Sequence, residues 1–206
     1  MKNVFLDANV IADWLLVYSK LKNTKNHEEK ELKLRELWKQ YTAPKICFEI
    51  LEIIRNKKMR NFSFFTSDLA LAEVGDVIFK ESRSIDLIKS GIAYRYIPSM
   101  IKKVVLTKDE INNIMNQIKT FREIFLGKKF SENKIKVHNK LEDPTFPVYL
   151  ISLFRIETYD AYLISQAYDA KCCFFITKDE KLRKEVKFDG LSLISPEKFL
   201  EELKKQ

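Results

Sequence analysis

Four acidic residues stand where a parallel β-sheet would present side chains to a ligand. Asp7 directly follows the apolar run KNVFL, and Asp179 comes two residues after the apolar run CCFFIT. Asp160 lies in the first turn of a helix expected over 159–169, and Glu49 lies in the first turn of an earlier expected helix. Because ligands bind beyond the carboxyl ends of the strands in an open parallel sheet, we expect these carboxylates to converge there.

A cluster of converging carboxylates needs a cation, because the negative charges otherwise repel one another. Oxygen ligands favour hard divalent cations, so the sequence predicts a site for Mg²⁺ or Mn²⁺. Such ions activate water and stabilise the charge that develops on a phosphate during phosphodiester hydrolysis. Glu52 lies three residues after Glu49 and stays open as the alternative ligand from that helix.

The sequence offers few residues for other chemistries. Its two histidines, His27 and His138, both lie in polar stretches, which argues against a histidine acid/base pair or a zinc site. Its four glycines form no phosphate-binding loop, and no GxSxG or GxGxxG motif is present. Cys47, Cys172 and Cys173 form no CxxC pair, so we expect reduced cysteines in the core.

The composition is that of a globular chain with a basic surface. The chain has 206 residues, 46% of them hydrophobic, a formal net charge of +8 and a pI of about 9.2, which favours a polyanionic partner such as nucleic acid. One basic turn is a candidate RNA contact and contains Arg55, Lys57, Lys58 and Arg60. No apolar run is long enough for a membrane span and the N-terminus does not read as a signal peptide, so we expect no membrane association and a cytoplasmic protein.

Strands and helices alternate at both ends of the chain, which predicts an α/β fold with a parallel sheet. We expect a first strand over 2–6, a helix over 8–18 with Asp13 on its solvated face, and a second strand over 40–44. The run 171–177 is apolar throughout, as in a strand buried on both faces. Residues 127–147 show no periodicity and are expected to form a long loop.

Three segments together resemble the PIN-domain family. They are FLDANVIADWL, APKICFEILEIIRNK and ETYDAYLISQAYDAKCCFFITKDEKL. That family contains metal-dependent ribonucleases, among them the VapC toxins of toxin–antitoxin pairs. The resemblance covers residues 1–60 and 148–206, and it implies one PIN-like domain over 1–206, with a central parallel sheet flanked by helices in three layers. Residues 62–147 would then be a helical insertion within that domain.

The resemblance also implies an activity, namely cleavage of RNA with one or two Mg²⁺ or Mn²⁺ ions. The residues similar to the family's metal-binding and catalytic acids are Asp7, Glu49, Asp160 and Asp179. Asn9 and Thr177 would orient these carboxylates through hydrogen bonds. As partners, the resemblance implies an RNA substrate, a second copy in a homodimer and, for a toxin, an antitoxin protein that fills the acidic groove.

Two other functions stay open at the level of sequence. One is a non-catalytic PIN-like module that binds RNA or a protein, because an acidic cluster can bind a metal ion without turnover. The other is a phosphatase of the haloacid dehalogenase type, whose first strand also ends in Asp-x-Asp. Here Asn9 stands at the second position, which removes the usual general acid and disfavours that class.

Overall fold

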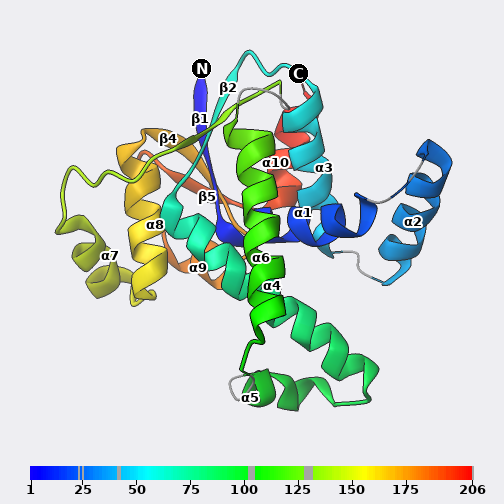
Figure 1. The fold of residues 1–206 in the computed structure, drawn as a ribbon. Coiled ribbons are helices and arrows are strands. Elements are labelled where there is room, and N and C mark those ends of the chain that lie inside the picture. The colour runs from blue at the N-terminus through cyan, green and yellow to red at the C-terminus, as the bar shows by residue number, and fades with distance from the viewer. Residues whose placement is uncertain (23, 25, 41–42, 102–104, 128–131, 206) are drawn as a thin grey trace.

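Five parallel strands form one central sheet (Figure 1). The structure, a computed structural model, describes residues 1–206 apart from positions 23, 25, 41–42, 102–104, 128–131 and 206. The strand order is β3-β2-β1-β4-β5, and the strands are β1 (Lys2–Leu6), β2 (Phe62–Thr66), β3 (Ile135–Val137), β4 (Cys172–Ile176) and β5 (Ser192–Ile194). All carboxyl ends therefore lie at one edge of the sheet, which is called the carboxyl edge below.

Helices cover both faces of the sheet, which confirms the expected α/β fold with three layers. One face packs against helices α1 (Ala8–Leu21), α3 (Ala43–Asn56), α4 (Asp68–Lys89), α6 (Lys108–Phe121) and α10 (Pro196–Lys204). The other face packs against α7 (Phe146–Phe154), α8 (Thr158–Asp169) and α9 (Glu180–Glu185). The remaining elements are α2 (His27–Gln40), α5 (Ile97–Ile101), the 3₁₀ turn Tyr94–Tyr96 and the π-helical turn Arg122–Leu126.

The central strand β1 divides its side chains between the two faces. Val4 and Leu6 point into the core beneath α1, whereas Phe5 points into the core beneath α8 and stacks on Phe175 of β4 with ring centroids 5.5 Å apart. This alternation follows from the two-residue period of a strand. Burial of β1 from both sides fixes the point at which the chain leaves the sheet, and therefore the position of Asp7.

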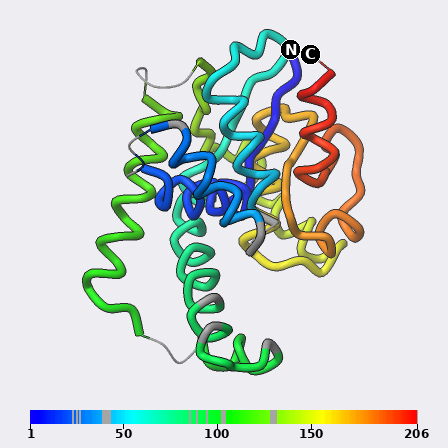
Figure 2. Tube along the Cα trace, turned by 90° about the vertical axis from the view of Figure 1, so that its right-hand side faces the viewer, coloured from blue at the N-terminus to red at the C-terminus, as the bar shows by residue number. Residues whose placement is uncertain are grey.

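A helical arm extends beyond the carboxyl edge. The arm consists of the C-terminal part of α4, the short helix α5 and the start of α6, and it projects below the sheet in both views (Figures 1 and 2). Its first helix, α4, begins at Ser67, whose side chain caps it by accepting from the backbone N–H of Ala70. The arm lies within segment 62–147, for which a helical insertion was expected.

The middle of the chain differs from the sequence-based expectations in three places. The expected second strand over 40–44 is replaced by the end of α2 at Gln40 and the start of α3 at Ala43, while 41–42 lie outside the described residues. Segment 62–147, expected as a helical insertion within the domain, supplies strands β2 and β3 as well as helices, and β2 pairs directly with β1. The expected loop over 127–147 contains β3, and 128–131 lie outside the described residues.

No helix in the described part of the chain is long and apolar enough to cross a membrane.

Candidate functional site

Asp7 sits at the junction of β1 and α1 and is only 7% exposed. Its Oδ1 accepts from the backbone N–H of Ala8 at 2.7 Å, and its Oδ2 accepts from Nδ2 of Asn9 at 2.6 Å. Its own backbone N–H donates to the carbonyl of Ile176, the last residue of β4. The carboxylate is thus held in one orientation at the carboxyl edge, where it also caps α1.

Asn9 joins the ends of β1 and β4. Besides its bond to Asp7, Nδ2 of Asn9 lies 3.0 Å from Oγ1 of Thr177, and Oδ1 of Asn9 accepts from the backbone N–H of Lys178 at 3.1 Å. Oγ1 of Thr177 also accepts from the backbone N–H of Asp179 at 3.0 Å. Asn9 and Thr177 therefore lie between Asp7 and Asp179. From there Asn9 can orient the carboxylate of Asp7, and Thr177 can position the backbone of Asp179.

Asp160 and Asp179 lie at the same edge as Asp7. Asp179 caps α9 by accepting from the backbone N–H of Leu182 with Oδ1, at 2.8 Å. Asp160 is half-buried in the first turn of α8. Burial, and after it the negative charges of Asp7 and Asp179, raises the pKa of Asp160 to about 7. Burial, with a smaller contribution from the charge of Asp179, raises the pKa of Asp7 to about 6. Three of the four acids expected from the sequence are therefore close enough to repel one another.

Glu73 is the fourth carboxylate of this cluster, and the sequence reasoning missed it. It lies in α4, the helix that starts directly after β2. Burial, and after it the charges of Asp7 and Asp160, raises the pKa of Glu73 to about 7. Its Oε2 is buried and has no hydrogen-bond partner among the described residues. The signal was present in the sequence, since FSFFT followed by a Ser cap and a helix repeats the strand–helix pattern of the first motif.

Glu49, the residue expected in this place, points elsewhere. Its Oε1 forms an ion pair with Nζ of Lys204 at 2.9 Å. Helix α10 begins at the carboxyl end of β5 and runs back along the sheet, so Lys204, near its end, lies toward the opposite edge. Glu49 therefore lies outside the cluster, because its carboxylate is held by Lys204. Glu73 occupies the place expected for Glu49, on a helix that leaves the carboxyl end of β2.

Glu52, the alternative ligand, is also engaged away from the cluster. Its carboxylate accepts from Nε1 of Trp14 at 3.1 Å and pairs with Arg55 at 3.5 Å. Neither acid of α3 therefore replaces Glu73.

The basic turn lies on the far side of the sheet from the acids. Arg55 lies in the last turn of α3, and Lys57, Lys58 and Arg60 come between α3 and the amino end of β2. Arg55 pairs with Glu52, and its guanidinium lies 5.7 Å from the ring centroid of Tyr18. This turn does not line the carboxylate cluster, because the amino and carboxyl ends of the strands are at opposite edges.

Asp13 departs from the expectation of a solvated residue. Its side chain is 1% exposed and pairs with Nζ of Lys178 at 2.8 Å. It is a buried charge that links α1 to the segment after β4.

The donor set of the cluster fits a divalent cation. Its four members offer only carboxylate oxygens, and one of these oxygens is buried and unpartnered. Burial first, and then repulsion between the charges, raises the pKa values of Asp7, Glu73 and Asp160, and a bound cation would relieve that repulsion. The side chains are not arranged as a closed site, since no three His, Cys, Asp or Glu residues in the described part of the chain form a group ready to hold a metal ion. Asp7, Glu73, Asp160 and Asp179 are the residues that would hold it.

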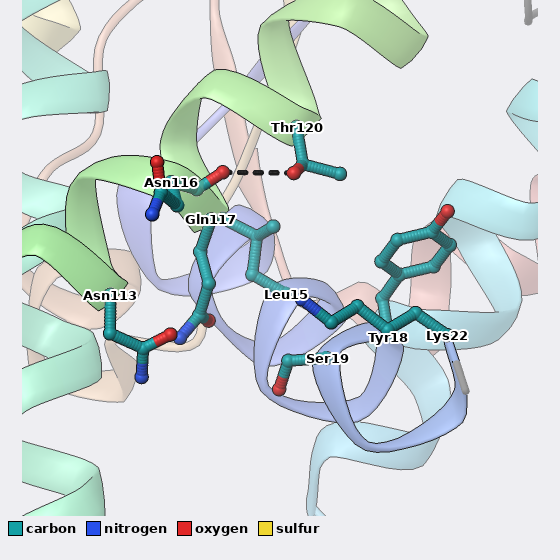
Figure 3. Close-up of a pocket in the computed structure, with 8 residues that line it drawn as sticks. All are labelled: Leu15, Tyr18, Ser19, Lys22, Asn113, Asn116, Gln117 and Thr120. Carbon is teal, nitrogen blue, oxygen red and sulfur yellow. Dashed lines mark hydrogen bonds between the residues drawn. The ribbon is translucent and has the colours of Figure 1, made fainter.

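A separate cavity lies between α1 and α6 and does not include these acids (Figure 3). It is lined by Leu15, Tyr18, Ser19, Lys22, Asn113, Asn116, Gln117 and Thr120. Its volume of about 20 Å³ is room for roughly one water molecule. A substrate the size of a nucleotide does not fit there.

The fold and the cluster define the class: a parallel α/β protein with a carboxylate cluster at its ligand-binding edge. No family model matches the sequence. A protein of Archaeoglobus fulgidus described as an uncharacterized protein is 35% identical over 89 residues, which cover 43% of this chain and 68% of that protein. The chain belongs to the same family as this archaeal protein, whose description names no activity.

Proposed function

We propose that this chain is a PIN-like endoribonuclease that depends on Mg²⁺ or Mn²⁺. The observation that carries the proposal is the convergence of Asp7, Glu73, Asp160 and Asp179 at the carboxyl edge, where burial and then the charges of Asp7 and Asp160 raise the pKa of Glu73. Several carboxylates close together destabilise the folded protein through their repulsion. A bound cation removes this repulsion and stabilises the folded protein. Glu73 takes the role that the family resemblance assigned to Glu49.

The residues around the cluster prepare it for such chemistry. A bound divalent ion supplies an activated water and stabilises charge on the attacked phosphate. Asn9 and the backbone N–H of Ala8 hold Asp7 in place, and the backbone N–H of Leu182 holds Asp179. Each bonded carboxylate oxygen keeps a second lone pair for a ligand. The protein thus fixes Asp7 and Asp179 before any substrate arrives, which limits the reorganisation that binding requires.

RNA as the substrate rests on the net charge of +8 and on a basic groove. The groove has a volume of about 500 Å³ and lies between the end of α6 and β3, with Lys119, Arg122 and Lys134 among its lining residues. Arg122 pairs with Asp68 at the start of α4, so the groove reaches the carboxyl edge. This groove replaces the basic turn as the RNA contact that we propose.

The proposed partners include a second copy of the chain. Helix α7 carries no charged residue, yet Val148, Tyr149 and Leu153 on its outer face are more than half exposed. Exposed Asp143 precedes this helix and exposed Arg155 follows it, so antiparallel pairing of two copies of α7 would oppose unlike charges. An antitoxin that fills the acidic groove and a cytoplasmic location are proposed from the family resemblance alone.

A second candidate is a PIN-like module that binds RNA or a protein without cleaving it. The observation in its favour is that no group ready to hold a metal ion is formed by the described side chains. The phosphatase alternative is disfavoured, because Asn9 donates its amide to Asp7 and Thr177 and has no proton to give to a leaving group.

The test is cleavage of a mixed RNA pool by the purified chain with Mg²⁺, with Mn²⁺ and with EDTA. We expect metal-dependent cleavage that falls at least 100-fold in E73Q and in D160N. The matched control is E49Q, which removes the acid that the sequence favoured and should keep wild-type activity. Loss of cleavage in E49Q but not in E73Q would refute the assignment of Glu73. A folded wild-type chain that cleaves nothing with either metal would favour the binding module.

A further inference from the structure

Asp13 and Lys178 form a buried ion pair beside the carboxylate cluster. Nζ of Lys178 lies 2.9 Å from Oδ1 and 2.8 Å from Oδ2 of Asp13, whose side chain is 1% exposed. The lysine side chain keeps 29% of its surface exposed. The ammonium group thus contacts both oxygens of one buried carboxylate.

The backbone of Lys178 belongs to the cluster, whereas its side chain leaves it. Lys178 stands between Thr177 and Asp179, and its backbone N–H donates to Oδ1 of Asn9. Asp13 follows Asn9 by four residues on α1, so both residues face the same segment after β4. The hydrogen bond to Asn9 holds the backbone of Lys178 beside the acids. The ion pair with Asp13 holds the ammonium group of Lys178 away from them.

A buried ion pair is a weak explanation for stability, because the desolvation of both charges offsets most of their attraction. The presence of Asp13 is better explained by the contacts that the Lys178 ammonium would make if it had no partner. A lysine ammonium is a compact charge on a flexible stem. Glu81 of α4 also acts on this ammonium, but Lys178 stands next in sequence to Asp179, so an unpaired ammonium on this stem can reach a carboxylate of the cluster.

We propose that Asp13 is a positioning residue that holds the Lys178 ammonium away from the carboxylate cluster and so keeps the cluster free for a divalent cation. This inference rests on the proposed metal-dependent function. Without the charge of Asp13, Lys178 turns to the acids, neutralises part of their charge and competes with the metal ion from within the protein.

The first experiment follows the Lys178 ammonium in metal-free protein by ¹⁵N NMR, with its signal assigned by its loss in K178M. In wild type the signal should not respond to D160N, because Lys178 is paired with Asp13. In D13N the signal should move, and adding D160N should move it again, because the ammonium now lies at the cluster. A D13N signal that ignores D160N would overturn the proposal.

The second experiment measures Mn²⁺ affinity by calorimetry in folded protein, with far-UV circular dichroism as the check of folding. We expect D13N to weaken Mn²⁺ binding at least 10-fold and D13N/K178M to restore it to within 3-fold of wild type. Equally weak binding in D13N and D13N/K178M would mean that Asp13 is merely structural, and that result overturns the proposal. If wild type takes up no Mn²⁺, the proposed metal site fails, while the NMR result still decides whether Asp13 directs Lys178.

Discussion

The negative charge of Asp160 on α8 raises the pKa of Glu73 on α4, although the two helices belong to opposite faces of the sheet. Helix α4 leaves the carboxyl end of β2, and α8 ends just before β4 begins at the amino edge, so its first turn lies at the carboxyl edge. Because β1 lies between β2 and β4, both carboxylates flank Asp7. Sheet order, and not closeness in sequence, assembles the cluster.

Removing one charge from this cluster should stabilise the metal-free protein. In D160N the repulsion with Asp7 and Asp179 is lost, while the amide keeps the shape of the side chain. We expect a rise in Tm of roughly 2–8 °C at pH 8 in EDTA, since about 1 kcal/mol shifts the Tm of a chain of this size by about 2–4 °C. Differential scanning calorimetry measures it. E49Q is the control and should change Tm little, because it loses only a partly exposed ion pair. A lower Tm for D160N would contradict the repulsion.

The stability of the metal-free protein should fall as the pH rises toward neutrality. The folded-state pKa values of Asp7, at about 6, and of Glu73 and Asp160, at about 7, lie above the ordinary values of 3.8 and 4.5. Between about pH 4 and 7 the folded state therefore holds more protons than the unfolded state, and the free energy of unfolding decreases with pH. Above about pH 8 these groups are ionised in both states, and their contribution is flat.

Urea unfolding from pH 4.5 to 8.5 in EDTA measures this dependence. The difference between wild type and D160N isolates the cluster from the other carboxyls, and we expect a shallower slope in D160N. Buried Asp13, whose pKa burial also raises, contributes equally to both proteins and cancels in this difference. An identical slope in the two proteins would show that Asp160 does not titrate in this range.

The sequence alone located three acids of the cluster, Asp7, Asp160 and Asp179, and missed the fourth, Glu73. Asp7 and Asp179 were found because an acid that follows an apolar strand has few structural explanations, and β1 and β4 are long and apolar. Glu49 was preferred to Glu52 because it lies among regularly spaced isoleucines, and Glu73 was not considered, because segment 62–147 was expected to be an insertion. The ion pair with Lys204 that holds Glu49 away from the cluster joins two distant parts of the chain and cannot be read from local pattern.

Short elements and long-range pairs explain the other misses. Strand β3 has three residues, too few to show a two-residue period between polar neighbours. Asp13 was expected in solvent because an acid on a helix usually is. Its burial depends on Lys178, which is 165 residues away in sequence, and no pattern within α1 reveals that partner. Local periodicity predicts elements well, but it does not identify the residues that meet when the elements pack.

The groove beside β3 should contribute more to RNA binding than the basic turn at the opposite edge. Reversing two charges in K119E/K134E removes cations from the groove that reaches the acids. We expect RNA affinity to fall roughly 10-fold or more and its salt dependence to weaken, by a slope of about 0.7 for each lost contact with single-stranded RNA. Fluorescence anisotropy in EDTA, which prevents cleavage, measures both. K57E/K58E makes the same charge change at the amino edge and should weaken binding less. The reverse order of the two variants would place the RNA at the basic turn.

The outer face of α7 should decide the oligomeric state. Leu153 is 53% exposed on a helix without charged residues, and a glutamate in its place would bring two negative charges together in an antiparallel pair of α7 helices. We expect wild type to have the mass of a dimer by light scattering and L153E to have the mass of a monomer.

Because Leu153 is already in contact with water, L153E should unfold at nearly the wild-type temperature, which separates a lost interface from lost folding. M115E, the same change of charge at an exposed apolar residue on α6, is the control and should leave the mass unchanged. A dimer that persists in L153E would move the interface away from α7, and a monomeric wild type would remove the second copy from the proposed partners.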